Sequence, residues 1–164
     1  MSANVDLVRS LFADWERGDF GRVDWADSGI EYCEVGGLEP GNWTGIAAMA
    51  AAWARVLSAW DAFRIDAEDF MELDAERVLV LVQPSGHGRT SGVDIQEIHA
   101  RGAVLLHVRG NTLTRFVLYW DRDRAYADLG LAPDSRSAPR STGREQSNPS
   151  PRGTGRREFR SPFR

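Results

Sequence analysis

The sequence predicts an α+β fold, in which an antiparallel sheet is covered by helices gathered on one side. Apolar residues recur at helical spacing in roughly the first 60 residues, whereas short apolar or alternating runs typical of strands dominate roughly the next 60. These strands follow one another without long helices between them, which favours antiparallel pairing over the alternating strands and helices of a parallel sheet. A chain of 164 residues is long enough for one domain with a substantial core.

Two helices are expected before the first strand. The first covers residues 4–17 and ends at Gly18, and a second, short helix covers residues 19–26. A strand over residues 30–35 and a loop rich in Gly and Pro over residues 36–42 come next.

A third helix and two strands follow this loop. Thr44 suits the N-cap position of the helix because its hydroxyl can accept a hydrogen bond from the first turn. The strand expected over residues 63–73 loses its alternation near residues 67–68, which indicates a β-bulge. Residues 76–83, with the sequence ERVLVLVQ, form a strand of the fully buried type. A Gly-rich connection over residues 84–92 then leads to a further strand over residues 93–101.

The chain next forms a hairpin around Gly110-Asn111, two residues that tolerate the positive φ angles of tight hairpin turns. This turn pairs Arg109 with Thr112 and predicts an unbroken register along both strands. One face of the hairpin then carries Ala103, Leu105, His107, Thr114, Phe116, Leu118 and Trp120. A closing helix begins near Asp121 and ends at Gly130.

The opposite face of the hairpin is also apolar, which favours burial of both faces. Its residues include Val104, Leu106, Val117 and Tyr119. Because such a face is too apolar to be left in water, we expect the protein to form a homodimer through it.

Charge divides the chain into a domain over residues 1–131 and a tail over residues 132–164. Residues 1–131 contain 12 Arg against 21 Asp and Glu, a net charge of −9, whereas residues 132–164 contain 8 Arg against 3 acids, a net charge of +5. The second segment consists mostly of Arg, Ser, Pro and Gly, so we expect a disordered tail. A solvated tail or a translated extension beyond the natural end of the domain is favoured over an arm that binds nucleic acid or an acidic partner.

Composition restricts the remaining classes of function. Cys33 is the single cysteine, which excludes an internal disulfide and a CxxC metal site. No histidine or cysteine stands at ligand spacing from the acidic residues near the last helix, so no metal and no cofactor is expected. The N-terminus lacks a basic-then-apolar signal pattern and no apolar run approaches the length of a membrane span, which predicts a cytoplasmic protein without membrane partners.

The order of these elements resembles the nuclear transport factor 2-like superfamily, which includes ketosteroid isomerases, limonene-epoxide hydrolases and SnoaL-like polyketide cyclases of bacteria. The resemblance covers residues 4–131 and rests on the motifs WERGDF, GNWTGIAAM, AERVLVLV, SGVDI and TRFVLYWDRDRAYADLGL. It implies a cone-shaped curved sheet, antiparallel or mixed, wrapped around three N-terminal helices as a cystatin-like α+β barrel. An apolar pocket is expected at the open end of the cone.

The chain departs from the catalytic pattern of these relatives. Leu11 stands where the isomerases carry a tyrosine, and Ala103 stands where they carry a protonated aspartic acid. Leu118 stands where the epoxide hydrolases and cyclases carry a catalytic aspartate. The isomerase base on the first strand falls nearest to Cys33 and Glu34. The known chemistries are therefore not carried over, and whether the protein is an enzyme stays open.

Other side chains could still transfer protons. Glu34 shares a strand face with Tyr32, and burial there would raise its pKa; the alternative is a surface glutamate. His107, on the predicted pocket face, is either a general base or a structural histidine. Glu97 and His99 alternate onto one face of their predicted strand and could act as base and orienting group.

Large apolar side chains from different elements should converge inside the cone. The expected ligand-binding set is Trp15, Tyr32, Trp53, Leu105, Phe116, Leu118 and Trp120. The leading expectation is a pocket that binds a small hydrophobic molecule, polycyclic or aromatic, with isomerase, cyclase or hydrolase-type acid–base chemistry left open. The alternative is a non-catalytic dimerisation or interaction module in which aromatic side chains fill the cavity.

Overall fold

The computed structural model describes residues 2–99 and 101–132, so the predicted tail beyond Ala132 lies outside the described residues. The elements in chain order are α1 (Ala3–Glu16), β1 (Ala26–Val35), β2 (Gly41–Thr44), α2 (Ile46–Ala59), β3 (Trp60–Glu72), β4 (Arg77–Gly88), α3 (Ile95–Ile98), β5 (Gly102–Arg109), β6 (Thr112–Tyr119) and α4 (Arg122–Leu129).

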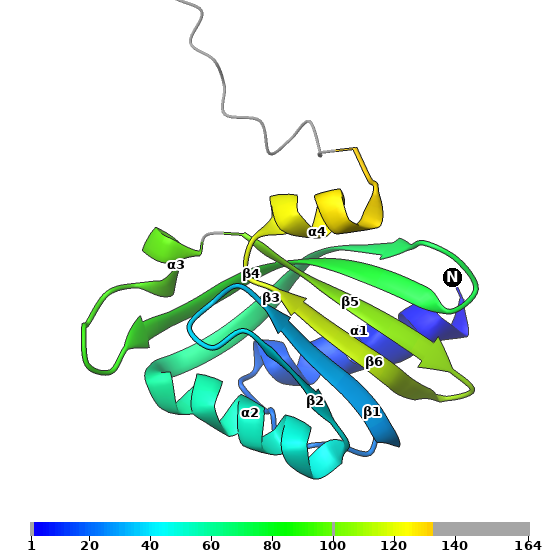
Figure 1. The fold of residues 1–164 in the computed structure, drawn as a ribbon, viewed down its shortest axis with the longest axis horizontal. Helices are drawn as coiled ribbons and strands as arrows, with labels where there is room; N and C mark the ends of the chain where they lie inside the picture. The colour runs from blue at the N-terminus through cyan, green and yellow to red at the C-terminus, as the bar shows by residue number, and fades with distance from the viewer. Residues whose placement is uncertain (1, 100, 133–164) are drawn as a thin grey trace, which may run out of the picture. The chain divides into compact units, whose positions relative to one another are not determined.

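The α+β class is confirmed. The six strands form one mixed sheet in the order β2-β1-β6-β5-β4-β3, in which β1 and β6 are parallel and the other neighbours are antiparallel. Helices α1 and α2 pack against its inner face, and α4 packs against its outer face (Figure 1). Since β2 and β3 are separate edges, the curved sheet does not close into the predicted barrel.

Aromatic rings fill the space between the inner face and the two helices. Phe116 of β6 lies 5.4 Å from Trp15 of α1, 5.7 Å from Trp53 of α2 and 5.0 Å from Tyr32 of β1, measured between ring centroids. Because each element contributes a large ring to the same cluster, burial of these rings holds the helices on the sheet. The predicted convergence of the aromatic residues is confirmed.

The hairpin register is correct near the turn and wrong beyond it. Arg109 pairs with Thr112 as predicted, but a bulge at Thr114 shifts the pairing by one residue, and His107 lies opposite Arg115. A shift of one residue moves every following side chain of β5 to the other face. The inner face therefore carries Val104 and Leu106, and the outer face carries Ala103, Leu105 and His107.

This shift removes the apolar surface on which the dimer was predicted. Val104 and Leu106 belong to the inner core, while Val117 and Tyr119 are buried in an outer cluster with Tyr126 of α4. The single chain thus covers its own outer face, and a homodimer stays a prediction without this support.

Helix α4 has the predicted ends. The Asp121 side chain accepts a hydrogen bond from the Asp123 backbone N–H, and Gly130 adopts the left-handed conformation with φ of 66°. The predicted bulge in β3 is also confirmed, because its register with β4 shifts between Ala67 and Asp69.

Two predicted elements are wrong. Residues 19–25 form an irregular segment that ends in a turn rather than a helix. The Trp25 indole N–H donates a 2.7 Å hydrogen bond to the Arg22 carbonyl, and so short a helix would gain little stability. In place of the strand predicted over residues 93–101, the described residues contain the single turn α3 (Ile95–Ile98). The His99 N–H closes that turn onto the Ile95 carbonyl at 2.7 Å.

Smaller differences affect three boundaries. The predicted loop over residues 36–42 runs into strand β2, which extends to Thr44 and leaves Gly45 as the N-cap of α2. Strand β4 continues to Gly88 into the predicted loop because residues 84–88 pair with β3. Of the three predicted N-terminal helices the second is absent, and the helices of the described chain up to residue 60 are α1 and α2.

Candidate ligand pocket

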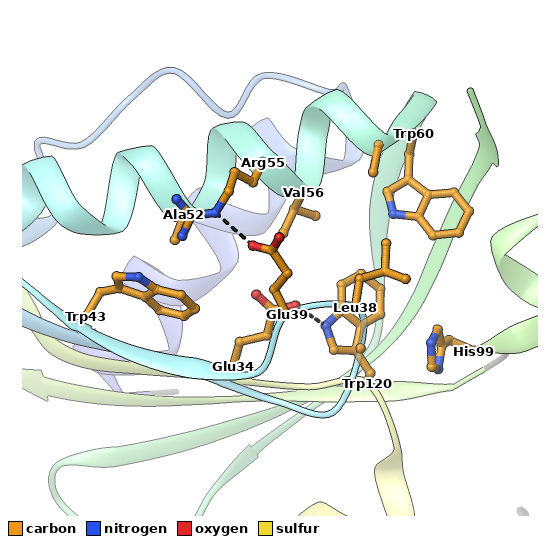
Figure 2. Close-up of a pocket in the computed structure, with 12 residues that line it drawn as sticks. Glu34, Leu38, Glu39, Trp43, Ala52, Arg55, Val56, Trp60, His99 and Trp120 are labelled. Atoms are coloured by element: carbon orange, nitrogen blue, oxygen red, sulfur yellow. Dashed lines mark hydrogen bonds and ion pairs between the residues drawn. The ribbon is translucent and has the colours of Figure 1, made fainter. Parts of the chain in front are cut away.

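A pocket of about 110 Å³ lies where the loop after β1 meets α2 and the end of β6. Figure 2 shows α2 contributing one wall, with Trp60, Trp120 and His99 along another. Its lining residues are Glu34, Gly37, Leu38, Glu39, Trp43, Ala52, Arg55, Val56, Ala59, Trp60, His99 and Trp120. Most of this wall is apolar, so the few polar groups in it define its chemistry.

Glu34 is the buried polar group of the pocket. It lies near the end of β1, beside the last residues of β6, and is only 5% exposed. The Trp120 indole N–H donates a 2.6 Å hydrogen bond to Oε1, and the Tyr32 hydroxyl donates to Oε2 at 3.3 Å. These two donors fix the orientation of the carboxylate at the pocket wall, and Figure 2 shows the hydrogen bond from Trp120.

Burial raises the pKa of the Glu34 carboxyl above its usual value, since removal from water disfavours the charged form. The hydrogen bonds from Trp120 and Tyr32 oppose this rise, and the nearby charges of Glu39 and Arg55 act in opposite directions. Burial also raises the pKa of the Tyr32 hydroxyl, so Tyr32 stays a neutral donor. The site therefore holds a carboxyl whose pKa lies above its usual value.

Gly37 lets the backbone pass close over this carboxylate. Gly36 and Gly37 both have positive φ, 76° and 77°, a conformation that favours glycine. A Cβ on Gly37 would overlap the Trp120 indole and lie 3.0 Å from Glu34 Oε1. The paired glycines thus form the turn that brings Leu38 and Glu39 to the pocket.

An exposed ion pair lies at the rim. Arg55 Nε of α2 is 2.9 Å from Glu39 Oε2, and the Arg55 guanidinium lies 5.6 Å from the centre of the Trp43 ring (Figure 2). Both side chains of the pair are largely exposed, so the pair contributes little to stability. It nevertheless joins the loop to the helix across the pocket.

His99 reaches the pocket by a different route from the one predicted. It follows the short helix α3, and its ring lies 5.3 Å from that of Trp120. Burial lowers its pKa, which favours the neutral imidazole. The predicted pairing with Glu97 is wrong because the turn replaces the alternation of a strand and leaves Glu97 exposed, outside the pocket wall.

The predictions that His107 and Leu105 face the pocket are wrong. The bulge at Thr114 shifts the register of β5 by one residue and places both side chains on the outer face. His107 lies opposite Arg115, and its pKa is lowered by burial and by the charges of Arg115 and Arg77. Leu105 packs in the outer cluster. Neither side chain lines the pocket.

The remaining predicted ligand-binding residues divide between pocket and core. Trp120 lines the pocket. Tyr32 does not line it, but its hydroxyl donates a hydrogen bond to Glu34. The others, like Leu11 of α1, are buried in the inner core: Trp15, Trp53, Phe116 and Leu118. A separate cavity of about 200 Å³ beside Trp15 and Trp53 is lined by Gly21 and apolar side chains.

Sequence reasoning did not single out Arg55, Glu39 or Leu38. A signal for Arg55 exists, because it stands at helical spacing with Ala52, Val56 and Ala59 and so interrupts an apolar face with a charge. The positions of Leu38 and Glu39 depend on the conformation of the glycine turn and carry no periodic signal.

The described residues contain no group of three or more His, Cys, Asp or Glu side chains arranged to hold a metal ion. Within the same residues, none of the helices has the length and apolar character needed to cross a membrane.

No protein-family model matches the chain, and no curated protein matches it. Solved structures do. A protein of unknown function from Burkholderia pseudomallei, described as NTF2-like, superposes with a TM-score of 0.63 at 18% identity, over 77% of this chain and 97% of that one.

Two further structures resemble the chain. A candidate SnoaL-like polyketide cyclase from Jannaschia gives a TM-score of 0.59 at 17% identity, over 80% of this chain and 93% of that one. A hypothetical protein from Catenulispora acidiphila with a ketosteroid isomerase-like fold, in complex with trimethylamine, gives 0.57 at 18% identity, over 77% and 94%. The chain therefore has the nuclear transport factor 2-like fold, shared with SnoaL-like and ketosteroid isomerase-like proteins, that its sequence resembles.

Proposed function

We propose that the protein binds a small hydrophobic molecule in this pocket and that Glu34 transfers a proton to or from it. The observation that carries the proposal is the buried Glu34 carboxyl at the pocket wall, oriented by Trp120 and Tyr32. A carboxyl whose pKa is raised by an apolar site can act as a general acid or base near neutral pH.

The size of the pocket limits the ligand. A cavity of about 110 Å³ is of the same order as the engineered cavity of about 150 Å³ that holds one benzene ring. The enclosed part of the ligand is therefore one ring or a compact branched group, and a polycyclic ligand would extend past the mouth. Leu38, Val56 and Trp60 supply apolar contacts for such a group.

His99 is the second proton-transfer candidate. Its neutral imidazole lies on the other side of Trp120 from Glu34 (Figure 2), so a substrate along this wall could exchange protons with both groups. Isomerase, cyclase and hydrolase-type reactions all need such transfers. The trimethylamine complex of the Catenulispora protein and the likeness to a candidate polyketide cyclase support small-molecule binding in this fold.

The test is exchange of the α-protons of cyclohexanone in D₂O, followed by NMR with the full-length protein. We expect the wild type to accelerate exchange and Glu34→Gln to lower the rate by about 10²–10⁴-fold, the usual contribution of a general base. Glu31→Gln removes an exposed carboxylate from the same strand and should leave the rate unchanged. Equal rates for the wild type and Glu34→Gln would refute proton transfer by Glu34.

The non-catalytic module remains the second candidate, favoured by the aromatic rings that fill the inner core. It predicts no ligand for the pocket. Sedimentation that shows a dimer, together with unchanged tryptophan fluorescence across single-ring ketones and amines, would favour this function over the first.

A further inference from the structure

Among the residues that the structure describes, none forms an ion pair with Glu34. Its two hydrogen-bond donors, the indole of Trp120 and the hydroxyl of Tyr32, are neutral. The cation at the rim, Arg55, is paired with Glu39. A buried carboxylate that accepts only neutral hydrogen bonds lacks the charge compensation that buried ions in proteins usually have.

Three of the six tryptophans line the pocket that contains this carboxylate: Trp43, Trp60 and Trp120. The face of an indole attracts cations more strongly than any other side-chain ring. Arg55 already lies over Trp43 at 5.6 Å, so one of these rings has a cation above it at the rim. Indoles around a buried carboxylate combine the two attractions that recognise alkylammonium ions.

We propose that the pocket binds a small hydrophobic ammonium ion, with its positive charge near Glu34 and its alkyl groups against the indoles of Trp60 and Trp120. The inference rests on the pocket of the proposed function and names the class of its ligand. A neutral ligand would leave the Glu34 charge uncompensated. An anionic ligand would have to displace Glu39 from Arg55 and would lie close to Glu34.

Three compact probes of similar size and different charge test this choice with the full-length protein. They are tetramethylammonium, neopentyl alcohol and pivalate, and calorimetry or tryptophan fluorescence gives their dissociation constants. We expect tetramethylammonium to bind at least tenfold more tightly than neopentyl alcohol and pivalate to bind most weakly. Equal binding of the first two probes would overturn the proposal, and preference for pivalate would overturn it in favour of an anion site at Arg55.

Two variants locate the binding energy. Glu34→Gln keeps the shape of the side chain and an acceptor for Trp120, and it should weaken tetramethylammonium at least tenfold while changing neopentyl alcohol less than twofold. Trp60→Phe leaves Glu34 in place but replaces the indole by a ring that attracts cations less strongly. This variant should reduce tetramethylammonium binding severalfold. Glu31→Gln, on the exposed side of β1, is the matched control and should change neither probe. Loss of neopentyl alcohol binding in parallel with tetramethylammonium would show a structural effect and count against the proposal.

The pH dependence gives an independent readout. Protons and the ammonium ion compete for Glu34, so affinity should fall as the pH drops through the pKa of Glu34. The other titratable groups at the pocket are His99, Glu39, Arg55 and the Tyr32 hydroxyl. Glu34→Gln retains all of them and is the reference, and an identical pH profile in this variant would contradict the role of Glu34.

Tetramethylammonium carries no exchangeable proton, which separates this inference from the proposed function. Ammonium binding without cyclohexanone exchange would refute proton transfer alone. Exchange without selective ammonium binding would refute the ligand class alone.

Discussion

The six tryptophans fall into two regions that differ in their polar surroundings. Trp15, Trp25 and Trp53 are buried in the inner core, where they pack ring against ring with Phe20 and Phe116. The other three line the pocket together with Glu34, Glu39, Arg55 and His99. Aromatic content alone therefore does not distinguish a filled core from a binding site. The buried carboxylate makes that distinction.

The largest expected effect is a loss of stability on truncation of a tryptophan in the inner core. Trp53→Ala removes a ring that lies within 6.3 Å of Trp15, Phe20, Tyr32, Phe63 and Phe116. Truncation of so large a buried side chain should lower the free energy of unfolding by about 3–5 kcal/mol, measured by urea denaturation. Trp43→Ala, at a partly exposed position of β2, is the control and should cost clearly less. Similar losses in the two variants would break the distinction between core and pocket rings.

An intermediate effect on stability is expected in the pocket, at the hydrogen bond between Trp120 and Glu34. Trp120→Phe keeps an aromatic ring but removes the N–H that lies 2.6 Å from Glu34 Oε1. Loss of a donor to a buried carboxylate should cost about 1–3 kcal/mol of stability. It should also raise the pKa of Glu34 further, because that hydrogen bond favours the charged form.

The measurement for this variant is an NMR titration of the Glu34 side-chain carboxyl. Trp60→Phe, which changes a pocket ring without a hydrogen bond to Glu34, should leave that pKa nearly unchanged. A Glu34 pKa that is equal in the wild type and in Trp120→Phe would show that the indole N–H does not tune the carboxyl.

Elements set by local patterns could be predicted from the sequence. Periodicity located α1 and α2, and Gly130 marked the end of α4. The register of β5 could not be predicted, because the bulge at Thr114 leaves no mark on the apolar alternation of either strand. One inserted residue was enough to exchange the faces of Leu105 and Val104.

The pocket residues that could be predicted from the sequence are likewise those whose positions follow from local patterns. Glu34 lies on β1, and Trp120 follows directly after β6. The position of neither residue depends on the register of β5. Arg55 and Glu39 meet only because the glycine turn carries the loop to α2, a contact between segments separated in sequence. His99 was singled out for the wrong reason, since it is a one-turn helix and not a strand that brings it to Trp120.

The smallest expected effect is a pH dependence of stability that belongs to Glu34. Its pKa is higher in the folded state than in the unfolded chain, so the folded state binds the proton more tightly. The contribution of Glu34 is therefore fully present below the unfolded value of about 4.3 and is lost as the pH rises through the folded pKa. Each unit of difference between the two pKa values corresponds to about 1.4 kcal/mol.

Urea denaturation of the wild type and Glu34→Gln between about pH 4 and pH 8 isolates this contribution. Other groups whose pKa values are shifted, such as Asp74 and His99, are present in both proteins and cancel in the difference. We expect the stability of the wild type to fall relative to Glu34→Gln as the pH rises. A difference that is independent of pH would mean that the carboxylate is as well stabilised in the pocket as in water, which would remove the reason for both a proton-transfer role and an ammonium ligand.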